Sequence, residues 1–348
     1  MAEWRGHCGG SIIIPPVTVT ASAPTRVDLA GGTIDIWPLY LFHPGAQTIN
    51  AAITLRARVR LDARADDRVV LVSDDLGRAT APLAFDDLPA DTALPLLAKL
   101  AHAFGARGVT ITTGSQAPAG AGIAGSSALN IAVAAALARW TGRTLDDEAL
   151  LEVAKNVEAQ VIGVPTGLQD YRPALYGGVA ALELGVHGAR RVALPVDAEA
   201  LSARLVVCYT GAPRQSGINN WEITKRRIDG DGDVTRAFDA IVAATQLMRA
   251  ALDAGDWAAA GQCLAREWQT RKQLAPGVTT PEIDALLASA VAAGAWAGKV
   301  CGAGGGGCVF VLAPPAATSA VRHAWTRAGA TVLAAVVDPA GVIVTEEN

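Results

Sequence analysis

A glycine-rich segment between two apolar stretches constrains the fold of this chain most strongly. Residues 109–113 are rich in β-branched side chains, which predicts a β-strand. Residues 128–140 are rich in Ala, Leu, Ile and Val and are followed by Gly142, which predicts a helix with a glycine at its C-terminal end. Residues 118–127, between them, carry three glycines and two serines. The order predicted is a strand, a tight loop and a helix.

This loop has the composition of an anion-binding turn. Gly120, Gly122 and Gly125 lack the Cβ atoms that would block a phosphate, and the N-terminus of the following helix carries partial positive charge. Ser126 and Ser127 supply hydroxyls for a phosphate oxygen or a hard cation. The loop is neither a Walker A loop nor a dinucleotide fingerprint. A flexible turn with a serine N-cap remains the alternative interpretation.

A carboxylate is predicted to point inward from the next helix, which begins near Asp147 and ends at Ile162 before Gly163. Glu158 falls on the apolar face of this helix, together with Leu150, Leu151, Ala154, Val157 and Val161. An inward carboxylate needs a cation or hydrogen-bond donors. A metal ion, an arginine or a structural ion pair would each satisfy it.

Two further segments carry acidic and basic residues beside turns. Asp170 follows the turn 164–169, where it is placed to accept a hydroxyl proton, to hold an ion or to cap the turn. Arg26 and Asp35 flank Gly31-Gly32 and suit a phosphoryl group and sugar hydroxyls, respectively. A salt bridge from Arg26 to Asp28 on the same side of the strand is the alternative.

Trp37 and a second glycine run complete the candidates. Trp37 suits stacking on a sugar face, although a tryptophan is more often part of a core. The glycines at 302 and 304–307 permit the backbone to pass close to a ligand or to the loop 118–127.

Composition indicates a folded protein that acts on small molecules. Of 348 residues, 51% are hydrophobic and 18% charged, enough for a large core, and the length suggests two domains. A net charge of −4 argues against nucleic acid as a partner, and no apolar run is long enough to cross a membrane. The five cysteines are scattered without zinc-ligand spacing, so we expect a reduced, cytoplasmic protein.

Periodicity places the remaining elements. Strands are predicted at 17–27, 59–61, 69–73, 177–184, 205–209, 331–337 and 342–344. Helices are predicted over 221–274, broken at 229–233 and near 253–256, and over 281–297. We expect the domain boundary between residues 195 and 203.

Three segments in order resemble the motifs of the GHMP kinase superfamily, named for galactokinase, homoserine kinase, mevalonate kinase and phosphomevalonate kinase. They are residues 24–35, 118–127 and 301–307, and the resemblance extends over most of the chain. The Ala-Gly-Gly-x-x-Asp form of the first motif, and residues 209–216, are similar to the branch of heptose-phosphate kinases and fucokinases.

The resemblance implies an α+β fold of two domains with a cleft for ATP and substrate between them. Residues 1–198 would form an ATP-binding domain like domain 2 of ribosomal protein S5, with a left-handed βαβ crossover. Residues 199–348 would form a ferredoxin-like domain.

It also implies a role for each candidate residue. Asp170 would act on the acceptor hydroxyl with the help of Arg26, and Ser126 and Glu158 would hold Mg²⁺. The substrate would contact Gly32, Asp35 and Tyr209. ATP would bind to Pro118, Gly120, Gly122, Gly125, Ser126, Ser127, Gly304 and Gly305.

The expected activity is ATP-dependent phosphorylation of a hydroxyl, the anomeric one above all, on a sugar or sugar phosphate. Thr33-Ile34 replaces the Glu-His pair usual in galactokinases, which disfavours galactose, and Ala124 replaces the usual glycine. The alternatives are a galactokinase, a mevalonate- or homoserine-type kinase, a decarboxylase that phosphorylates first, and a sensor without turnover. A monomer or a homodimer is expected. Whether Arg214 or the basic run 225–227 reaches a substrate phosphate stays open.

Overall fold

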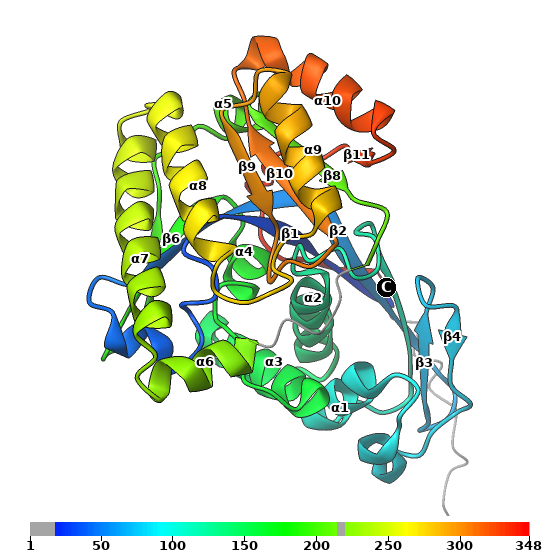
Figure 1. Ribbon diagram of the computed structural model, residues 1–348. Coiled ribbons are helices and arrows are strands. Elements are labelled where there is room, and N and C mark those ends of the chain that lie inside the picture. The colour runs from blue at the N-terminus through cyan, green and yellow to red at the C-terminus, as the bar shows by residue number, and fades with distance from the viewer. Residues whose placement is uncertain (1–17, 214–219, 348) are drawn as a thin grey trace, which may run out of the picture.

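The computed structural model describes residues 18–213 and 220–347, which form two β-sheets surrounded by helices (Figure 1). Cys8 and Arg214 lie outside the described residues. Among the described helices, none combines the length and the apolar composition needed to cross a membrane.

The first sheet is built around the long strand β2. Its strand order is β12-β1-β2-β5-β3-β4, and β6 and β7 extend it from the first part of β2. The pair β3 and β5 is parallel, whereas the other pairs are antiparallel. The strands are β1 (Thr18–Ala30), β2 (Gln47–Ala63), β3 (Val69–Ser73), β4 (Arg78–Ala79), β5 (Val109–Ser115), β6 (Val179–Gly185), β7 (Gly188–Ala193) and β12 (Ile343–Glu347).

Four helices cover one face of this sheet. The central one, α2, is buried along most of its length because it is apolar nearly all round, and it packs between α1 and α3 and against β1 and β2. Glycines in the left-handed conformation end α1 at Gly105 and α3 at Gly163. The helices are α1 (Pro95–Phe104), α2 (Gly125–Trp140), α3 (Asp147–Ile162) and α4 (Tyr171–Tyr176), and short 3₁₀ turns lie at Leu39–Phe42 and Phe85–Ala90.

The second sheet has the antiparallel order β11-β8-β10-β9, formed by β8 (Leu205–Tyr209), β9 (Ala297–Val300), β10 (Cys308–Leu312) and β11 (Thr331–Leu333). This order, with helices after β8 and between β10 and β11, is ferredoxin-like and confirms the α+β prediction. The remaining helices are α5 (Ala198–Ser202), α6 (Asn220–Ile228), α7 (Gly232–Asp253), α8 (Trp257–Arg271), α9 (Pro281–Ala292) and α10 (Thr318–Arg327), with a 3₁₀ turn at Pro315–Ala317.

The two sheets share a hydrophobic core. Val27, Leu29 and Ile49 of the first sheet pack with Leu264 of α8 and Phe310 of β10. The C-terminal strand β12 leaves the second sheet and pairs with β1. Within the described ranges, the strands of the first sheet lie in 18–193 and 343–347 and those of the second in 205–333; the division into 1–198 and 199–348 stays a prediction.

Some predicted boundaries differ from the structure. The helix predicted over 281–297 ends at Ala292 because Gly294 adopts a left-handed φ of +103° and Ala297 begins β9. The strand predicted over 331–337 ends at Leu333. Asp146, rather than Asp147, caps α3 by accepting a hydrogen bond from the backbone N–H of Ala149.

Candidate active site

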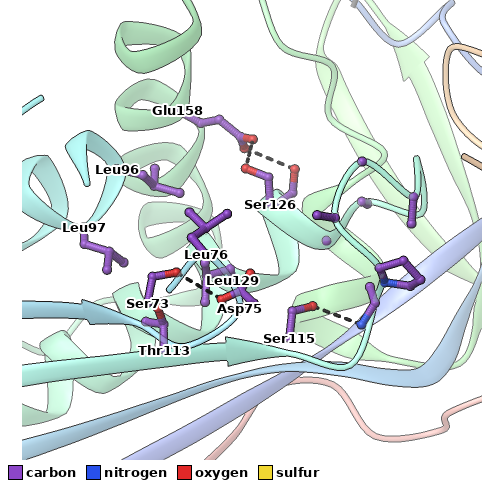
Figure 2. Close-up of a pocket in the computed structure, with 18 of the residues that line it drawn as sticks. Ser73, Asp75, Leu76, Leu96, Leu97, Thr113, Ser115, Ser126, Leu129 and Glu158 are labelled. Carbon is purple, nitrogen blue, oxygen red and sulfur yellow. Dashed lines mark hydrogen bonds between the residues drawn. The ribbon is translucent and has the colours of Figure 1, made fainter. Parts of the chain in front are cut away.

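A pocket of about 550 Å³ lies where the loop 118–125 meets α1, α2 and the ends of β3 and β5 (Figure 2). One end is lined by leucines, among them Leu76, Leu96, Leu97 and Leu129. Hydroxyls, carboxylates and two arginines also line the pocket, and Ser73 and Asp75 lie close to Leu76 (Figure 2). Nine residues predicted from the sequence meet in this pocket: Arg26, Pro118, Gly120, Gly122, Gly125, Ser126, Ser127, Glu158 and Asp170.

The loop turns tightly because several of its residues have positive φ. Gly120 and Gly122 have φ of +70° and +72°, and Ala124, the residue before α2, has φ of +60°. A non-glycine residue is strained there, which explains why glycine is the usual residue at position 124 in the family that the sequence resembles. The loop delivers the N-terminus of α2, with Ser126 and Ser127 in its first turn, to the pocket wall.

Glu158 points from α3 toward these serines, as its position on the inward face predicted. Its Oε1 accepts a hydrogen bond from Ser126 Oγ at 2.7 Å, and its Oε2 accepts from Ser127 Oγ at 3.1 Å and Tyr171 Oη at 2.5 Å. The residue is 7% exposed. Its recorded partners in the described part of the chain are thus neutral hydroxyls rather than a lysine or arginine.

This donor set fits a hard divalent cation. Hydroxyl and carboxylate oxygens are the ligands that Mg²⁺ prefers, and Mg²⁺ commonly takes one or two protein ligands plus nucleotide phosphates. No group of three or more His, Cys, Asp or Glu side chains in the described ranges forms a self-sufficient metal site. A cation at Ser126 and Glu158 would therefore also need oxygens from a bound nucleotide.

Tyr171 is a site residue that the sequence analysis missed. Burial, the neighbouring Glu158 charge and their hydrogen bond raise the pKa of Tyr171, so its phenol stays protonated and donates. The sequence signal that could have identified Tyr171 is its position directly after Asp170.

Asp170 lies on the other side of the pocket, next to Arg26. Arg26 Nε and Nη2 both donate to Asp170 Oδ1, at 2.9 and 2.6 Å, and Arg26 Nη1 donates to the carbonyl of Gly122 at 3.1 Å. Although burial opposes it, the charge of Asp170 raises the pKa of Arg26. Arg26 thus links the glycine loop to the acid, and the alternative salt bridge from Arg26 to Asp28 is not what the structure contains.

Asp35 lies behind the loop that carries Asp170. It is 1% exposed and accepts a hydrogen bond from the backbone N–H of Gln169 at 2.9 Å. A Cβ at Gly167 would come within 2.0 Å of Asp35 Oδ2, so this approach requires glycine. Burial, and then the Asp170 carboxylate, raise the pKa of Asp35 to about 6. Its role toward a substrate stays a prediction.

Four other predicted residues lie away from the pocket wall. A Cβ at Gly32 would be 2.1 Å from Arg271 Nη1, and a Cβ at Gly304 would be 2.2 Å from the carbonyl of Val278. The backbone N–H of Gly305 donates to the same carbonyl at 3.0 Å, and Tyr209 pairs with neighbouring strands at the end of β8. These glycines allow close approach of neighbouring protein atoms, and their contact with ligands stays a prediction.

The second glycine run packs against the first. A Cβ at Gly302 would lie 2.6 Å from the carbonyl of Gly122, and one at Gly307 would lie 2.6 Å from that of Ala121. The Cys308 N–H donates to the Ala121 carbonyl at 2.7 Å. The structure thus shows the predicted close approach to the loop 118–127, and the predicted approach to a ligand stays a prediction.

The basic run on α6 is engaged locally. Lys225 pairs with Glu222 and Arg226 with Asp231, whereas Arg227 donates to His43 at 2.9 Å. Trp37 is 66% exposed and is therefore not a core tryptophan.

Two segments of the chain match known family models. Residues 91–178 match the family model described as the GHMP kinases N terminal domain, and residues 248–331 match that described as GHMP kinases C terminal.

Individual relatives extend over most of the chain. A D-glycero-alpha-D-manno-heptose 7-phosphate kinase of Campylobacter jejuni is 28% identical over 309 residues, covering 86% of this chain and 90% of that protein. A galactokinase of Mycobacterium tuberculosis is 28% identical over 351 residues, with 90% and 94% covered. The crystal structure of a D-glycero-D-manno-heptose 1-phosphate kinase from Bacteroides thetaiotaomicron has the same fold, with a TM-score of 0.76 at 23% identity over 95% of this chain and 99% of that one.

Proposed function

The chain belongs to the GHMP kinase family, and we propose that it transfers the γ-phosphoryl group of ATP to a hydroxyl of a sugar or sugar phosphate. The observation that carries this proposal is the convergence of three features in one pocket: the glycine loop, the Ser126–Glu158 pair and the Arg26–Asp170 pair. These features come from distant segments of the sequence. Together they would supply a phosphate-binding loop, a cation site and an acid for the acceptor, which phosphoryl transfer uses.

The pocket suits a nucleoside triphosphate at both of its ends. The loop 118–125 and the N-terminus of α2 offer backbone N–H groups and partial positive charge to phosphates. The leucine-lined end offers an apolar surface to a purine base. Mg²⁺ held by Ser126 and Glu158 together with the nucleotide would supply charge neutralisation on the phosphates.

Asp170 is the residue we assign to the acceptor. Its carboxylate is one-third exposed and lines the pocket, so it can accept the proton of an attacking hydroxyl or orient that hydroxyl. Arg26 fixes one oxygen of Asp170 and, through Gly122, sets its distance from the phosphate loop. Catalysis by this chain is thus mainly positioning and charge stabilisation.

The acceptor that we favour is a heptose phosphate or a similar sugar. This choice is based on the substrate in the name of the Campylobacter relative and on the sequence of the first motif. We place the protein in the cytoplasm, as a monomer or a homodimer. The side chains of the run 225–227 contact Glu222, Asp231 and His43, and a contact of this run with an acceptor phosphate stays open. A galactokinase, a mevalonate- or homoserine-type kinase, a decarboxylase and a sensor are the competing proposals.

The substitution Asp170→Asn tests the assignment. We expect kcat to fall by about 100-fold or more, the size of a general-base contribution, while the affinity for an ATP analogue stays near wild type. Thermal unfolding should be measured alongside, because the change removes the charge partner of buried Arg26. Turnover close to wild type in a folded variant that binds nucleotide would show that Asp170 does not act on the acceptor.

A further inference from the structure

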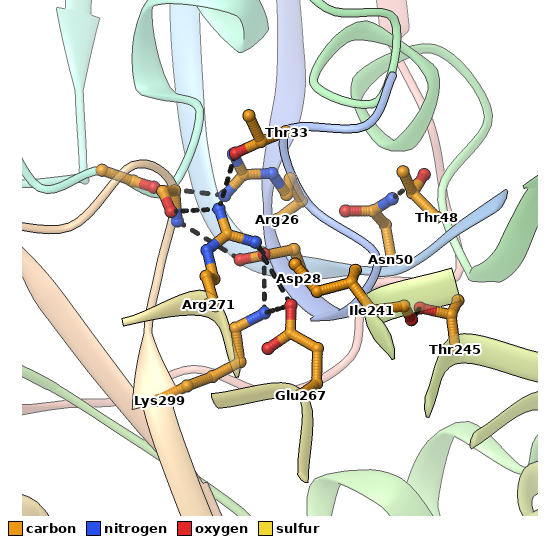
Figure 3. Close-up of polar contacts among 12 residues, drawn as sticks. Arg26, Asp28, Thr33, Thr48, Asn50, Ile241, Thr245, Glu267, Arg271 and Lys299 are labelled. Atoms are coloured by element: carbon orange, nitrogen blue, oxygen red, sulfur yellow. Dashed lines mark hydrogen bonds and ion pairs between the residues drawn. The ribbon is translucent and has the colours of Figure 1, made fainter. Parts of the chain in front are cut away.

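Four buried charged side chains form a cluster between the first sheet and the second half of the molecule (Figure 3). Asp28 comes from β1, Glu267 and Arg271 from α8, and Lys299 from β9. Lys299 Nζ lies 3.0 Å from Asp28 Oδ2 and 2.9 Å from Glu267 Oε1, and Arg271 Nη1 lies 3.3 Å from each of these oxygens. We call these four residues the charge cluster.

The charge cluster is electrically balanced and lies outside the candidate active site. Its side chains are at most 3% exposed, and none of the four lines the pocket. Although burial opposes it, Lys299 and then Arg271 hold the pKa of Asp28 below its usual value. Removing one cation alone would leave a buried negative charge without its partner, which is strongly destabilising. The effect of a single substitution on stability would therefore mask any specific role of the residue.

Arg271 and Asp28 both contact Gly302, and Arg271 also reaches Thr33. Arg271 Nη2 donates to the carbonyl of Gly302 at 2.7 Å and to Thr33 Oγ1 at 3.3 Å. Asp28 Oδ1 accepts from the N–H of Gly302 at 3.2 Å. Both polar backbone groups of Gly302 are therefore held by the charge cluster.

Gly302 in turn contacts the glycine loop of the pocket. The space beside its Cα is filled by the carbonyl of Gly122, which a Cβ would approach to 2.6 Å. Gly122 is also the residue whose carbonyl accepts from Arg26. A contiguous path of packed atoms thus runs from Arg271 through Gly302 to the loop 118–125.

We propose that Arg271 is a positioning residue for the nucleotide: by holding Gly302 it supports the loop 118–125 in the conformation that receives the phosphates of ATP. This inference rests on the proposed function, since it takes that loop to be the phosphate site. Lys299 belongs to the same cluster, but the hydrogen bonds of its Nζ in the described structure go to Asp28 and Glu267 rather than to Gly302, so it serves as the matched control.

Two double variants with the same charge balance separate positioning from electrostatics. Arg271→Met with Glu267→Gln, and Lys299→Met with Glu267→Gln, each remove one cation and one anion of the cluster and leave Asp28 with one cation of the cluster, in addition to the charge of nearby Arg26. Only the first loses the hydrogen bonds to Gly302 and Thr33. The readouts are the Kd of a non-hydrolysable ATP analogue by calorimetry, hydrogen exchange of the amides in 118–125, and the thermal midpoint.

We expect the Arg271 double variant to bind the analogue about 10-fold more weakly and to exchange the loop amides faster, a change typical of coupling through packed contacts. The Lys299 double variant should bind within about 3-fold of wild type. Equal affinities and equal exchange in the two double variants would overturn the proposal.

Two further outcomes are informative. If the first double variant does not fold, Arg271→Lys replaces it, because lysine keeps the charge but not the forked contacts, and it should weaken binding likewise. If wild-type protein binds no ATP analogue, the proposed function is wrong, and the hydrogen exchange of 118–125 still decides whether Arg271 orders the loop.

Discussion

Two carboxylates share the pocket in different surroundings. Asp170 is held by the Arg26 guanidinium, whereas Glu158 is held by three neutral hydroxyls. Within the described ranges, the hydroxyls leave Glu158 without a cationic side chain as partner, whereas Arg26 fixes one oxygen of Asp170. The different surroundings are what support assigning the two acids to different tasks.

At the residue scale, Tyr171→Phe should weaken divalent metal binding. The change removes one hydroxyl from Oε2 of Glu158 and leaves the buried ring, so it frees the carboxylate to rotate. Partners that orient a ligand typically contribute about 10- to 100-fold in metal affinity, and we expect a loss in that range. Titration with Mn²⁺ in the presence of ADP, followed by electron paramagnetic resonance, measures it.

Tyr176→Phe provides the control for this change. Tyr176 lies on the same helix, α4, but its hydroxyl donates to Glu148 at 3.3 Å, outside the pocket. Equal Mn²⁺ affinity in the two tyrosine variants would mean that Tyr171 does not orient Glu158.

Asp35→Asn should change how stability depends on pH. Because burial and then Asp170 raise the pKa of Asp35 to about 6, the folded protein binds this proton more tightly than the unfolded chain. This group alone therefore lowers the free energy of unfolding as pH rises from about 4 to 6, by on the order of 3 kcal/mol in total. Asparagine removes that loss, so the variant should gain stability relative to wild type at about pH 7 but not at about pH 4.

Urea unfolding of both proteins at the two pH values measures the difference. Asparagine keeps an oxygen that can accept from the Gln169 N–H, which makes the comparison fair. A constant difference between the two proteins across this range would refute the raised pKa.

At the element scale, the glycine run at 302–307 supports the loop 118–125 by direct backbone contact. Gly302→Ala places a methyl group against the carbonyl of Gly122 at 2.6 Å and forces a side chain into φ of +65°. Gly105→Ala also introduces a side chain at positive φ, +73°, but no atom lies within 4 Å of its Cβ. The second change should cost about 1 kcal/mol of strain alone, and the first should cost more and weaken ATP binding.

Chemical unfolding and calorimetric titration with the ATP analogue distinguish the two glycine variants. The same stability loss in both, with unchanged nucleotide affinity, would mean that the contact between the glycine runs is not structural support.

Local signals predicted several elements well. The helix α3 was predicted within its observed bounds because an aspartate cap and a terminal glycine mark its ends. Glu158 was predicted to point inward because helical periodicity needs no tertiary information. The partner of Arg26 was not predictable from the sequence. Asp28, on the same strand, forms ion pairs with Lys299 and Arg271 instead, and these residues are distant in sequence.

At the scale of the whole molecule, the site depends on contacts between distant segments. The close approach of the glycines at 302 and 307 to the loop 118–127 was predicted from the sequence, because glycines permit close backbone approach. The leucines of α1 that line the other end carry no motif, and β12 returns to β1 from the end of the chain. Such features follow from the assembled fold and have no local signature.

The most direct test of the account is the product of the reaction. Purified protein is incubated with MgATP and, in turn, a panel of aldoses, heptose 7-phosphate and mevalonate, and the products are weighed by mass spectrometry with ADP quantified in parallel. We predict that one sugar or sugar phosphate gains a phosphoryl group in step with ADP release, and that Asp170→Asn abolishes this gain. Binding of ATP and sugar with no phosphorylated sugar in any mixture would contradict the account, as would carbon dioxide release from a phosphorylated acid.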